Sequence, residues 1–395
     1  MTATDRPTSA QPALLKDLNE RAVLDVIRAD APISRAEISR RARISKPTVS
    51  VALQSLLHAG LVREAAEARE GRSYGAVFFE PVSDAALVFG VDIGARFLRG
   101  ALCDLSGAIR ARQDVEVDAA GPEELLAAVG RLRDGLVAVS GLPADRIDSA
   151  VTGVPGVVEQ QTGRMRLASN AHGLEGTSVA AELEQRLGLP VTVENDVNLA
   201  ALGEQWRGVA GGVDDFLFLS IGTGMGAGLV LRGELHRGRN GAAGEVDFSF
   251  GGLEQDVDPC AGAVSAFAAR LAAEDGAATT LAPPFGARDI FSAARAGDGL
   301  AVAVVAEVAR RIALHIVPVA AVTDVSLVVL GGGLGSNGDL LLEPVRDLLG
   351  QWVPYPPSIA VSTLGEAAVL TGALALGLRH ALDDVVERPE PAVRA

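Results

Sequence analysis

The chain has 395 residues, of which 48% are hydrophobic, so it is long enough for two or three domains with apolar cores of their own. Its formal net charge of −15 would by itself argue against a nucleic-acid partner, but the charge is unevenly distributed. Residues 31–63 contain six basic residues and one acidic residue, a local excess that indicates a small anion-binding module attached to an acidic body.

Cysteine usage and apolar runs indicate the cellular compartment. Cys103 and Cys260 lie far apart and match no disulfide framework, which indicates a reducing environment. Residues 2–12 are polar and do not resemble a signal peptide, and the apolar run at residues 301–322 is interrupted by charged side chains. We therefore expect a soluble cytoplasmic protein that does not associate with a membrane.

The N-terminal region predicts three helices. Apolar residues repeat at three- and four-residue spacings over residues 15–27 and predict the first helix. Ser34, followed three residues later by Glu37, predicts the start of a second helix, and Ser45 is a suitable N-cap for a third. Two short helices joined by a tight turn predict a helix-turn-helix, whose second helix can enter the major groove of DNA.

A wing is predicted after the third helix. Residues 61–64 and 76–79 can pair as a hairpin whose tip contains residues 69–74. Lys46 on the third helix and Arg72 in the wing are expected to contact phosphates, whereas short polar side chains on the helix are candidates for base edges. The expected DNA-contacting residues are Arg43, Ser45, Lys46, Thr48, Ser50, Gln54 and Arg72.

Two points qualify this interpretation. Arg43 stands where such turns often use glycine, so a left-handed backbone there would cost about 1–2 kcal/mol. The alternative is that the three helices are only a packing module with solvated charges. The polar face of the third helix, the scarcity of acidic residues and the hairpin favour DNA binding over this alternative.

From residue 87 onward, apolar strands alternate with helices, which predicts an α/β body. Residues 87–94 predict a buried strand that ends in a turn, and residues 97–103 predict a second strand. A later strand, residues 191–193, is followed directly by Glu194-Asn195-Asp196, where ligands of parallel sheets normally bind.

Asn195 and Asp196 have two possible roles at this strand end. An aspartate can accept a proton from a sugar hydroxyl, and an asparagine can bind two neighbouring hydroxyls. Both residue types also cap helices, and a helix is predicted immediately afterwards. The two roles are compatible, and we expect both.

Glycine-rich loops follow several predicted strands and let the backbone approach a ligand closely. Gly156 lies in the first of these, and Asn170 lies in a loop after it. Residues 222–228 could expose consecutive N–H groups that cradle phosphate, or could be a tight turn at a sheet edge. Residues 331–333 precede a predicted helix whose N-terminus favours an anion.

Taken in order, these segments resemble the ROK family (repressors, open reading frames, kinases) over residues 15–382. The resemblance implies that residues 87–385 form a two-lobed, actin-like (ribonuclease H-like) sugar kinase fold that usually dimerises. It also implies that residues 13–82 are the winged helix-turn-helix of the family's transcription regulators, usually repressors of carbohydrate genes. The segments that carry it are residues 91–94, 194–198, 221–228, 237–245 and 330–333.

The resemblance further implies roles for single residues. Asp196 matches the catalytic base of the kinases, and Asn195 and Glu245 match ligands of sugar hydroxyls. The expected effector-binding residues are Gly156, Asn170, Asn195, Asp196 and Glu245. The residues that match nucleotide-phosphate contacts are Asp92, Gly94, Gly222, Thr223, Gly224 and Gly332.

Departures from the family pattern indicate lost chemistry. Phe248 replaces a histidine that contacts sugar and ligates zinc, and of the cysteine-rich zinc segment only Cys260 remains. One thiolate cannot build a tetrahedral site, so we expect no structural zinc and no cofactor. Arg96 replaces a threonine of the phosphate loop and crowds the place of the nucleotide. Phosphoryl transfer depends almost entirely on positioning, so we expect that sugar kinase activity is lost.

Three hypotheses remain open at this point. The first is a transcriptional regulator that binds a double-stranded DNA operator as a homodimer or tetramer and senses a sugar-like effector. The second is an ATP-dependent sugar kinase with a DNA-binding head, and the third is a regulator whose body serves only for dimerisation. Operator and effector are not identifiable from the sequence.

Overall fold

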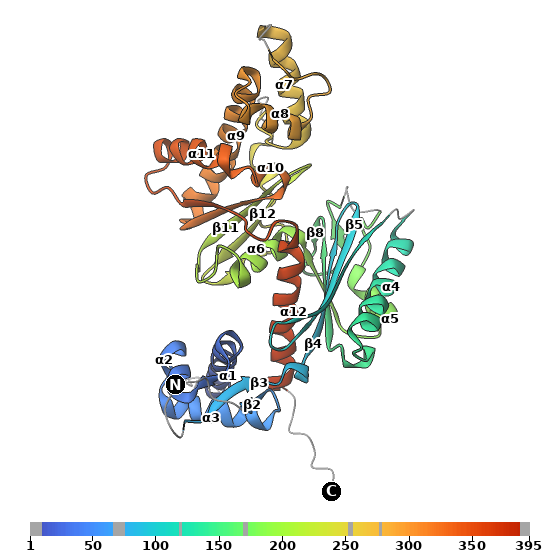
Figure 1. Ribbon diagram of the computed structural model, residues 1–395, viewed down its shortest axis with the longest axis vertical. Helices are drawn as coiled ribbons and strands as arrows, with labels where there is room; N and C mark the ends of the chain where they lie inside the picture. The colour runs from blue at the N-terminus through green and yellow to red at the C-terminus, as the bar shows by residue number, and fades with distance from the viewer. Residues whose placement is uncertain are drawn as a thin grey trace, which may run out of the picture.

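The computed structural model describes residues 10–65, 76–117, 121–168, 173–251, 256–275 and 279–387. These residues form an N-terminal head and a body of two lobes (Figure 1). The last helix, α12 (Ala368–Glu387), runs from the second lobe along the first lobe to the head (Figure 1). Within the described ranges, no helix is both long enough and apolar enough to span a bilayer.

Three helices make up most of the head: α1 (Ala10–Asp30), α2 (Arg35–Ala42) and α3 (Lys46–His58). Both predicted N-caps are confirmed. Ser34 Oγ accepts a hydrogen bond from the Glu37 N–H at 3.4 Å, and Ser45 Oγ accepts one from the Thr48 N–H at 3.4 Å. Each helix therefore begins where a side chain satisfies one of its free N–H groups.

The predicted apolar face of α1 is partly wrong. Val23, Leu24 and Ile27 are buried in the head core, but Leu15 and Leu18 are 60% and 53% exposed. The first turns of α1 carry these leucines beyond the core, and Leu18 instead lines a cavity between the head and the body. Spacing along a helix identifies one face, but it does not identify what that face packs against.

A three-stranded antiparallel sheet completes the head, in the order β1-β3-β2. The predicted hairpin is therefore present, but its second strand, β3, begins at Phe78, two residues later than predicted. Its tip, with Arg72, lies outside the described residues. The strands are β1 (Ile33–Ser34), β2 (Val62–Glu64) and β3 (Phe78–Pro81).

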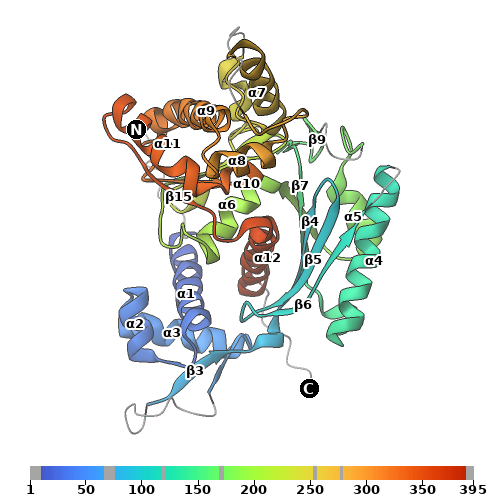
Figure 2. The same cartoon turned by 45° about the horizontal axis from the view of Figure 1, so that its top comes forward.

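The first lobe of the body contains a five-stranded mixed sheet in the order β10-β7-β4-β5-β6. Three strands form an antiparallel meander, and β7 and β10 continue parallel to β4. Helices α4 (Pro122–Ser140) and α5 (Val179–Leu187) cover one face, and α12 covers the other (Figure 2). The strands are β4 (Leu87–Ile93), β5 (Phe97–Asp104), β6 (Ile109–Glu116), β7 (Ser149–Val154) and β10 (Val191–Asn195).

The second lobe repeats this topology, because its sheet has the order β13-β12-β11-β14-β15 with the same strand directions. A mixed sheet of this order in each of two lobes is the predicted actin-like architecture. The strands are β11 (Phe216–Ile221), β12 (Met225–Leu231), β13 (Glu234–Leu235), β14 (Leu327–Gly331) and β15 (Ser358–Val361).

Alternation along β11 divides the second lobe between two cores. Leu217 and Leu219 belong to a core with residues of α9, while Phe216 and Phe218 point to the opposite face, covered by α6 (Asp196–Arg207). The remaining helices of this lobe are α7 (Ala261–Asp275), α8 (Ala287–Arg295), α9 (Gly299–Thr323), α10 (Gly332–Gly335) and α11 (Gly338–Trp352).

Helices α6 and α12 cross at glycines, and this contact lies at the junction of the lobes. A Cβ on Gly372 of α12 would lie 1.7 Å from the Leu199 carbonyl oxygen of α6. A Cβ on Gly203 of α6 would lie 2.3 Å from the Ala368 carbonyl oxygen. The two backbones approach so closely that only glycine fits at either position.

The expected boundary between head and body, near residues 82–87, is bridged by apolar contacts. One cluster of buried side chains contains Leu53 and Phe79 of the head together with Leu105 and Leu378 of the body. Backbone bonds join the two parts as well, since the Leu105 N–H donates to the Ser83 carbonyl at 3.0 Å. The head is therefore packed onto α12 and the edge of the first lobe.

Candidate effector cleft and DNA-reading helix

The side of α3 opposite the head core carries the predicted DNA contacts. Lys46 and Gln54 are exposed on it, and Arg43 is exposed in the turn before it. Arg43 has φ 56° and ψ 34°, the left-handed conformation expected for this turn. An arginine held in this conformation places a positive charge at the N-terminus of α3, where a DNA phosphate would also be attracted.

The hydroxyl groups on α3 are more constrained than the sequence indicates. The hydroxyls of Ser45 and Thr48 are hydrogen-bonded to each other at 2.8 Å, and Ser50 Oγ donates to the Lys46 carbonyl at 2.9 Å. Contacts of these three residues with base edges have to compete with these local bonds. Gln54 has an exposed side chain with a longer reach and is the best placed of the candidates for direct readout.

Val51 was not predicted as a DNA contact, but it lies 59% exposed on α3, between Lys46 and Gln54 in the sequence. An apolar side chain of this size can contact the methyl group of thymine. The sequence did contain a signal, since Val51 falls outside the three- and four-residue spacing of the buried Val49, Leu53 and Leu56.

In the body, the end of β10 places three polar residues at the start of α6. The Asn195 side chain uses both of its polar atoms: Oδ1 accepts from the Asn198 N–H at 2.9 Å, and Nδ2 donates to the Gly156 carbonyl at 2.9 Å. The predicted capping role of Asn195 is confirmed. The second bond ties the loop of Gly156 to α6, so these two predicted effector residues are adjacent.

Gly156 has φ 117°, and a Cβ there would lie 2.9 Å from the Arg166 carbonyl oxygen, so the loop requires glycine. The other predicted residue of this region, Asn170, lies outside the described residues.

Glu194 holds this arrangement together, although it was not predicted as a site residue. Its side chain is buried, and its Oε1 accepts from the Asn195 N–H and from Asn198 Nδ2, both at 2.9 Å. Its Oε2 accepts from Arg237 Nε. Glu194 therefore positions Asn195 from behind, and Arg237 brings the loop that precedes Glu245 to the same point.

Glu245 reaches the cleft because two glycines anchor its loop. Gly241 has φ 83°, and a Cβ there would lie 2.2 Å from the Val158 carbonyl oxygen of the first lobe. Gly244 has φ 98°, and a Cβ there would lie 1.8 Å from the Ala227 carbonyl oxygen of the second lobe. The loop thus touches both lobes, and Glu245 lies between them.

Three carboxylates gather in this cleft. Burial, the largest cause, acts together with the nearby charges of Asp92 and Glu245 to raise the pKa of Asp196 to about 7, against the opposing effect of the Val197 N–H at 2.8 Å from Asp196 Oδ1. Burial also raises the pKa of Glu245. The structure therefore brings Asp196 and Glu245, two of the predicted effector residues, near enough for their charges to interact, in poorly solvated surroundings.

Asp92, predicted on the nucleotide side, has a partner that the sequence did not reveal. Arg99 Nη1 lies 3.2 Å from Asp92 Oδ2, and Arg99 Nη2 lies 2.9 Å from Oε2 of Glu366, in the short 3-10 turn just before α12. The Arg99 side chain is only 14% exposed. Burial raises the pKa of Asp92 to about 6 against the effect of Arg99. These residues do not fit a nucleotide-bound Mg²⁺, because the carboxylate already has a buried counter-charge.

The phosphate loop itself differs from the expectation in one respect. Arg96 is exposed and pairs with Glu116 Oε1 at 3.0 Å, so it points along the sheet edge. Gly94 donates its N–H to the Phe97 carbonyl at 3.0 Å, which closes the turn between β4 and β5. Arg96 therefore does not crowd the expected nucleotide position. The positive charge next to Asp92 comes from Arg99 instead.

Residues 222–228 do not form one continuous loop, because β12 begins at Met225. Gly226 and Gly228 belong to β12, where they pair with Ser220 and Phe218 of β11. A Cβ on Gly228 would lie 2.7 Å from Ala201 Cβ, so this glycine allows α6 to pack onto the sheet. The alternative of a tight turn is correct as to the turn, but the turn joins β11 to β12, neither of which is an edge strand of the sheet.

Only Gly222, Thr223 and Gly224 form that turn. Its Gly222 N–H donates back to the Gly224 carbonyl at 2.9 Å, and the Gly222 carbonyl accepts from the Ala261 N–H at 2.9 Å. Gly332, at φ 77°, packs against the backbone of Ile221 next to it. A phosphate contact for these glycines stays a prediction.

The segment expected to have lost its zinc carries other contacts. Cys260 is buried, and its N–H donates to Asp258 Oδ1 at 2.7 Å. His315 Nδ1 bonds the Arg311 carbonyl oxygen at 2.9 Å, while Phe248 is 64% exposed. In the described part of the chain, no three His, Cys, Asp or Glu side chains are grouped as metal ligands. The absence of zinc stays a prediction.

The raised pKa of Asp196 predicts how stability depends on pH. The folded pKa of about 7 exceeds the ordinary value of 3.8, so the folded state binds more protons and loses stability as the pH rises from about 4 to 7. We expect Asp196→Asn to remove this loss. Between pH 4 and pH 8 the free energy of unfolding of the variant should rise by about 2 kcal/mol relative to that of the wild type, after allowance for solvent screening. Urea unfolding at both pH values measures it.

Asp145→Asn, which changes an exposed carboxylate in the short 3-10 turn between α4 and β7, is the matched control and should show no such gain. Equal pH profiles for Asp196→Asn and the wild type would contradict the raised pKa.

Comparison with known proteins identifies the body. The ROK family model matches residues 88–380, which is most of the chain. The chain belongs to the ROK family. A MarR family model matches residues 17–73, so this ROK protein has a MarR-type winged helix head.

Relatives of two kinds match this ROK protein. A xylose repressor of Caldicellulosiruptor bescii is 27% identical over 404 residues and covers 96% of this chain and 99% of its own. A glucokinase of Halalkalibacterium halodurans is 30% identical and covers 72% of this chain and 92% of its own. The first alignment includes nearly the whole chain, whereas the second leaves out more than a quarter.

Similar solved structures are also of two kinds, a regulator that matches nearly the whole chain and kinases that match about three quarters of it. A ROK family transcriptional regulator, a homologue of the E. coli MLC protein, superposes with a TM-score of 0.77 at 23% identity and covers 94% of this chain and 98% of its own. A ROK glucokinase from Streptomyces griseus, in complex with glucose and AMPPNP, has a TM-score of 0.62 at 28% identity and covers 74% of this chain and 100% of its own. This ROK protein, with its winged head, is a sugar-related DNA-binding transcriptional repressor.

Proposed function

We propose that this repressor binds its operator as a homodimer through α3 and that a neutral sugar, bound in the cleft around Asp196, changes its affinity for DNA. We further propose that the body has lost sugar kinase activity. The xylose repressor named above makes D-xylose the first effector to test. The proposal distinguishes two sides of the cleft. On the sugar side the polar residues Asn195, Asp196 and Glu245 are retained, and on the nucleotide side Asp92 is paired with Arg99.

The observation that carries the proposal is the contrast between these two sides. On the sugar side, Asn195, Asp196 and Glu245 lie near one another, and burial raises the pKa of both carboxyl groups, so these polar groups are poorly solvated. On the nucleotide side, Arg99 pairs with Asp92 and with Glu366, so one oxygen of Asp92 is already engaged. A pocket of this kind favours binding of a sugar over transfer of a phosphoryl group to it.

A route from the cleft to the head supports the regulatory part. Asp196 is the first residue of α6, and α6 crosses α12 at Gly203 and Gly372 without any intervening side chain. The last turns of α12 contribute Leu378 and Leu382 to the apolar cluster shared with the head. A small rotation of α6 on sugar binding would therefore be passed to α12 and would change the spacing of two heads in a dimer.

A sugar kinase is the second candidate, and one observation favours it. With a pKa of about 7, Asp196 would be close to the optimum for a general base at neutral pH. The charge pairing of Asp92 with Arg99 opposes this candidate, and the two are distinguished by assay.

The test combines binding and turnover on the full-length protein. D-xylose, D-glucose and N-acetylmannosamine are each titrated against it in a thermal unfolding assay, and a ligand at one hundred times its Kd should stabilise the protein by about 2.7 kcal/mol. The same sugar should change the affinity for operator DNA, obtained by selection from genomic fragments, at least tenfold. Glu245→Gln should abolish both effects, and Asp145→Asn should retain them.

Other outcomes decide between the alternatives. ATP-dependent phosphorylation of a sugar that is abolished by Asp196→Asn would establish the kinase and refute the loss of activity. Operator binding by a dimer that no sugar alters or stabilises would support a body used only for dimerisation.

A further inference from the structure

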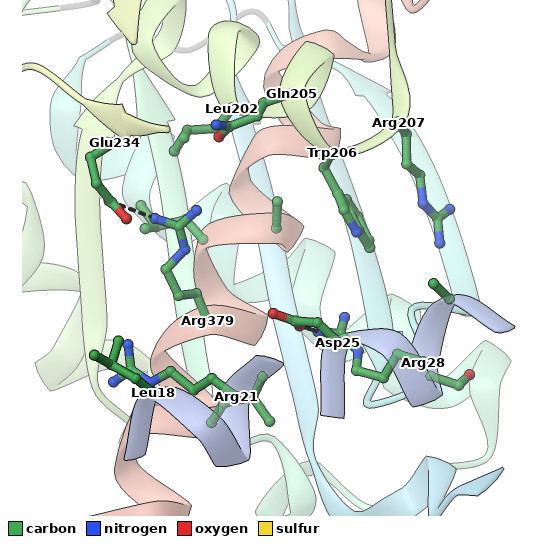
Figure 3. Close-up of a pocket in the computed structure, with 15 residues that line it drawn as sticks. Leu18, Arg21, Asp25, Arg28, Leu202, Gln205, Trp206, Arg207, Glu234 and Arg379 are labelled. Carbon is green, nitrogen blue, oxygen red and sulfur yellow. Dashed lines mark hydrogen bonds and ion pairs between the residues drawn. The ribbon is translucent and has the colours of Figure 1, made fainter. Parts of the chain in front are cut away.

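A cavity of about 710 Å³ lies between the head and the body, away from the effector cleft (Figure 3). Its lower wall in the view is α1 of the head, and its other walls come from the end of α6, from α12 and from β13 (Figure 3). Neither the family nor the proposed function gives it a role. It is large enough for a metabolite of the size of a sugar phosphate.

The charged side chains that line this cavity are mostly basic. They carry a net of two positive charges, although the whole chain carries a net charge of −15. These residues are Arg21, Arg28, Arg207 and Arg379, with the two carboxylates Asp25 and Glu234.

The carboxylates neutralise this charge only weakly. Arg379 Nη1 lies 3.0 Å from Glu234 Oε2, and Arg28 Nη1 lies 3.4 Å from Asp25 Oδ1. The Glu234 and Asp25 side chains are 77% and 64% exposed, and ion pairs with exposed partners contribute little. The cavity therefore keeps capacity for an anion.

Arg28 is the most constrained of these cations. Its side chain is only 11% exposed, and its Nε is buried with no hydrogen-bond partner in the described part of the chain. Burial lowers the pKa of Arg28, and the like charge of Arg207 lowers it further, while Asp25 opposes both. A buried donor without an acceptor is costly. Because Nε has almost no accessible surface, an anion in the cavity would bind Arg28 at the Nη end of its guanidinium instead.

Arg207, at the end of α6, lines the wall of the cavity that the body contributes, and its side chain is held by two contacts. Its guanidinium stacks 4.1 Å from the centre of the Trp206 ring, and one of its Nη atoms donates to the Gly107 carbonyl. Arg28 and Arg207 thus approach the cavity from the head and from the body respectively (Figure 3). Apolar side chains, Leu18 and Leu202, line the remaining space and can cover the carbon part of a ligand.

We propose that this cavity is a second effector site, which binds a small phosphorylated metabolite between the arginines of the head and those of the body. The phosphate group would lie between Arg28 and Arg207, because the bidentate geometry of guanidinium suits a phosphate monoester. A bound ligand would bridge α1 to α6 and α12 and would therefore hold the head in one orientation on the body.

The two sites are connected by one helix. Asp196, in the effector cleft, begins α6, and Arg207, in the cavity, ends it about 16 Å away at a rise of about 1.5 Å per residue. A ligand at either end that moves α6 changes the geometry of the other site, so the affinities for the neutral sugar and for the phosphorylated ligand are coupled. The cavity itself is separate from the sugar site, so the proposed phosphate site does not depend on sugar binding.

The test uses inorganic phosphate and glucose 6-phosphate on the full-length protein at constant ionic strength, with chloride as the balancing anion. Both should raise the melting temperature above the chloride reference, and calorimetry gives their Kd values. Arg28→Gln should weaken both Kd values at least tenfold. If Arg28→Gln fails to fold, Arg379→Gln tests the same cavity from the α12 wall. Arg131→Gln, which changes an exposed arginine on α4, is the control.

Four results would overturn the proposal. The first is equal phosphate binding by the wild type, Arg28→Gln and Arg379→Gln, which would place the anion elsewhere. The second is loss of phosphate binding in Asp196→Asn, which would place it in the effector cleft. The third is weaker operator binding by Arg28→Gln while neither phosphate compound binds the wild type, which would assign the arginines to DNA. The fourth is a rise in melting temperature with neutral sugar but with neither phosphate compound, which would contradict this proposal and leave the proposed function intact.

Discussion

Gly372→Ala is expected to destabilise the protein by about 3 kcal/mol or more, a large effect for the addition of a single methyl group. The added Cβ would lie 1.7 Å from the Leu199 carbonyl oxygen and 3.0 Å from the Gly203 N–H nitrogen, both of them backbone atoms of α6. A side chain could rotate away from such a clash, but backbone cannot. Helices α6 and α12 would have to separate, and with them the junction of the two lobes.

Gly350→Ala is the matched control for this prediction. Gly350 is exposed near the end of α11, and a Cβ there meets no other atom within 4 Å. The same change should therefore stabilise the protein by about 1 kcal/mol, because alanine is the better helix former. Urea unfolding of the two variants measures the difference, and equal stabilities would show that the helices do not approach as closely as described.

Arg43→Gly is expected to weaken operator binding while it stabilises the head. Glycine relieves the left-handed backbone at φ 56° and should add up to about 1 kcal/mol to the stability of the head. If Arg43 contacts a phosphate, its loss should lower the slope of log K against log salt concentration by about 0.9. Because stability and affinity change in opposite directions, poor folding cannot explain the loss of binding.

Lys46→Ala provides the comparison for this experiment. It removes an exposed charge at the first position of α3 without any change in backbone strain, so it should lower the salt slope by the same amount and leave stability almost unchanged. Fluorescence anisotropy with operator DNA at several salt concentrations measures both variants. Salt slopes equal to that of the wild type would show that α3 is not the surface that meets DNA.

Much of the fold was predictable because its signals are local. The caps at Ser34 and Ser45 depend on residues three positions apart, and both were confirmed. The strand before Asp92 and the strand before Asn195 were recognisable as short apolar runs that end in polar residues. Local hydrogen bonding and side-chain periodicity act over a few residues, so a single sequence contains them.

Errors arose where one residue type serves different tertiary purposes. The glycines at 226 and 228 resembled a phosphate loop, but one of them makes room for Ala201 of α6. Leu18 resembled a core residue, but it lines a cavity against the body. The role of a glycine or of an apolar side chain depends on the surface that it faces, and the sequence alone does not show that surface.

By itself, the sequence determined the order of the elements, the helix caps and the family, and it predicted Asn195, Asp196 and Glu245 as site residues. Only the tertiary structure decided which charges meet. Arg99 pairs with Asp92 and with Glu366, 267 positions further along the chain, and Arg28 faces Arg207 across a cavity. Burial and counter-charge decide what such groups can bind, and both depend on contacts between segments that are remote in sequence.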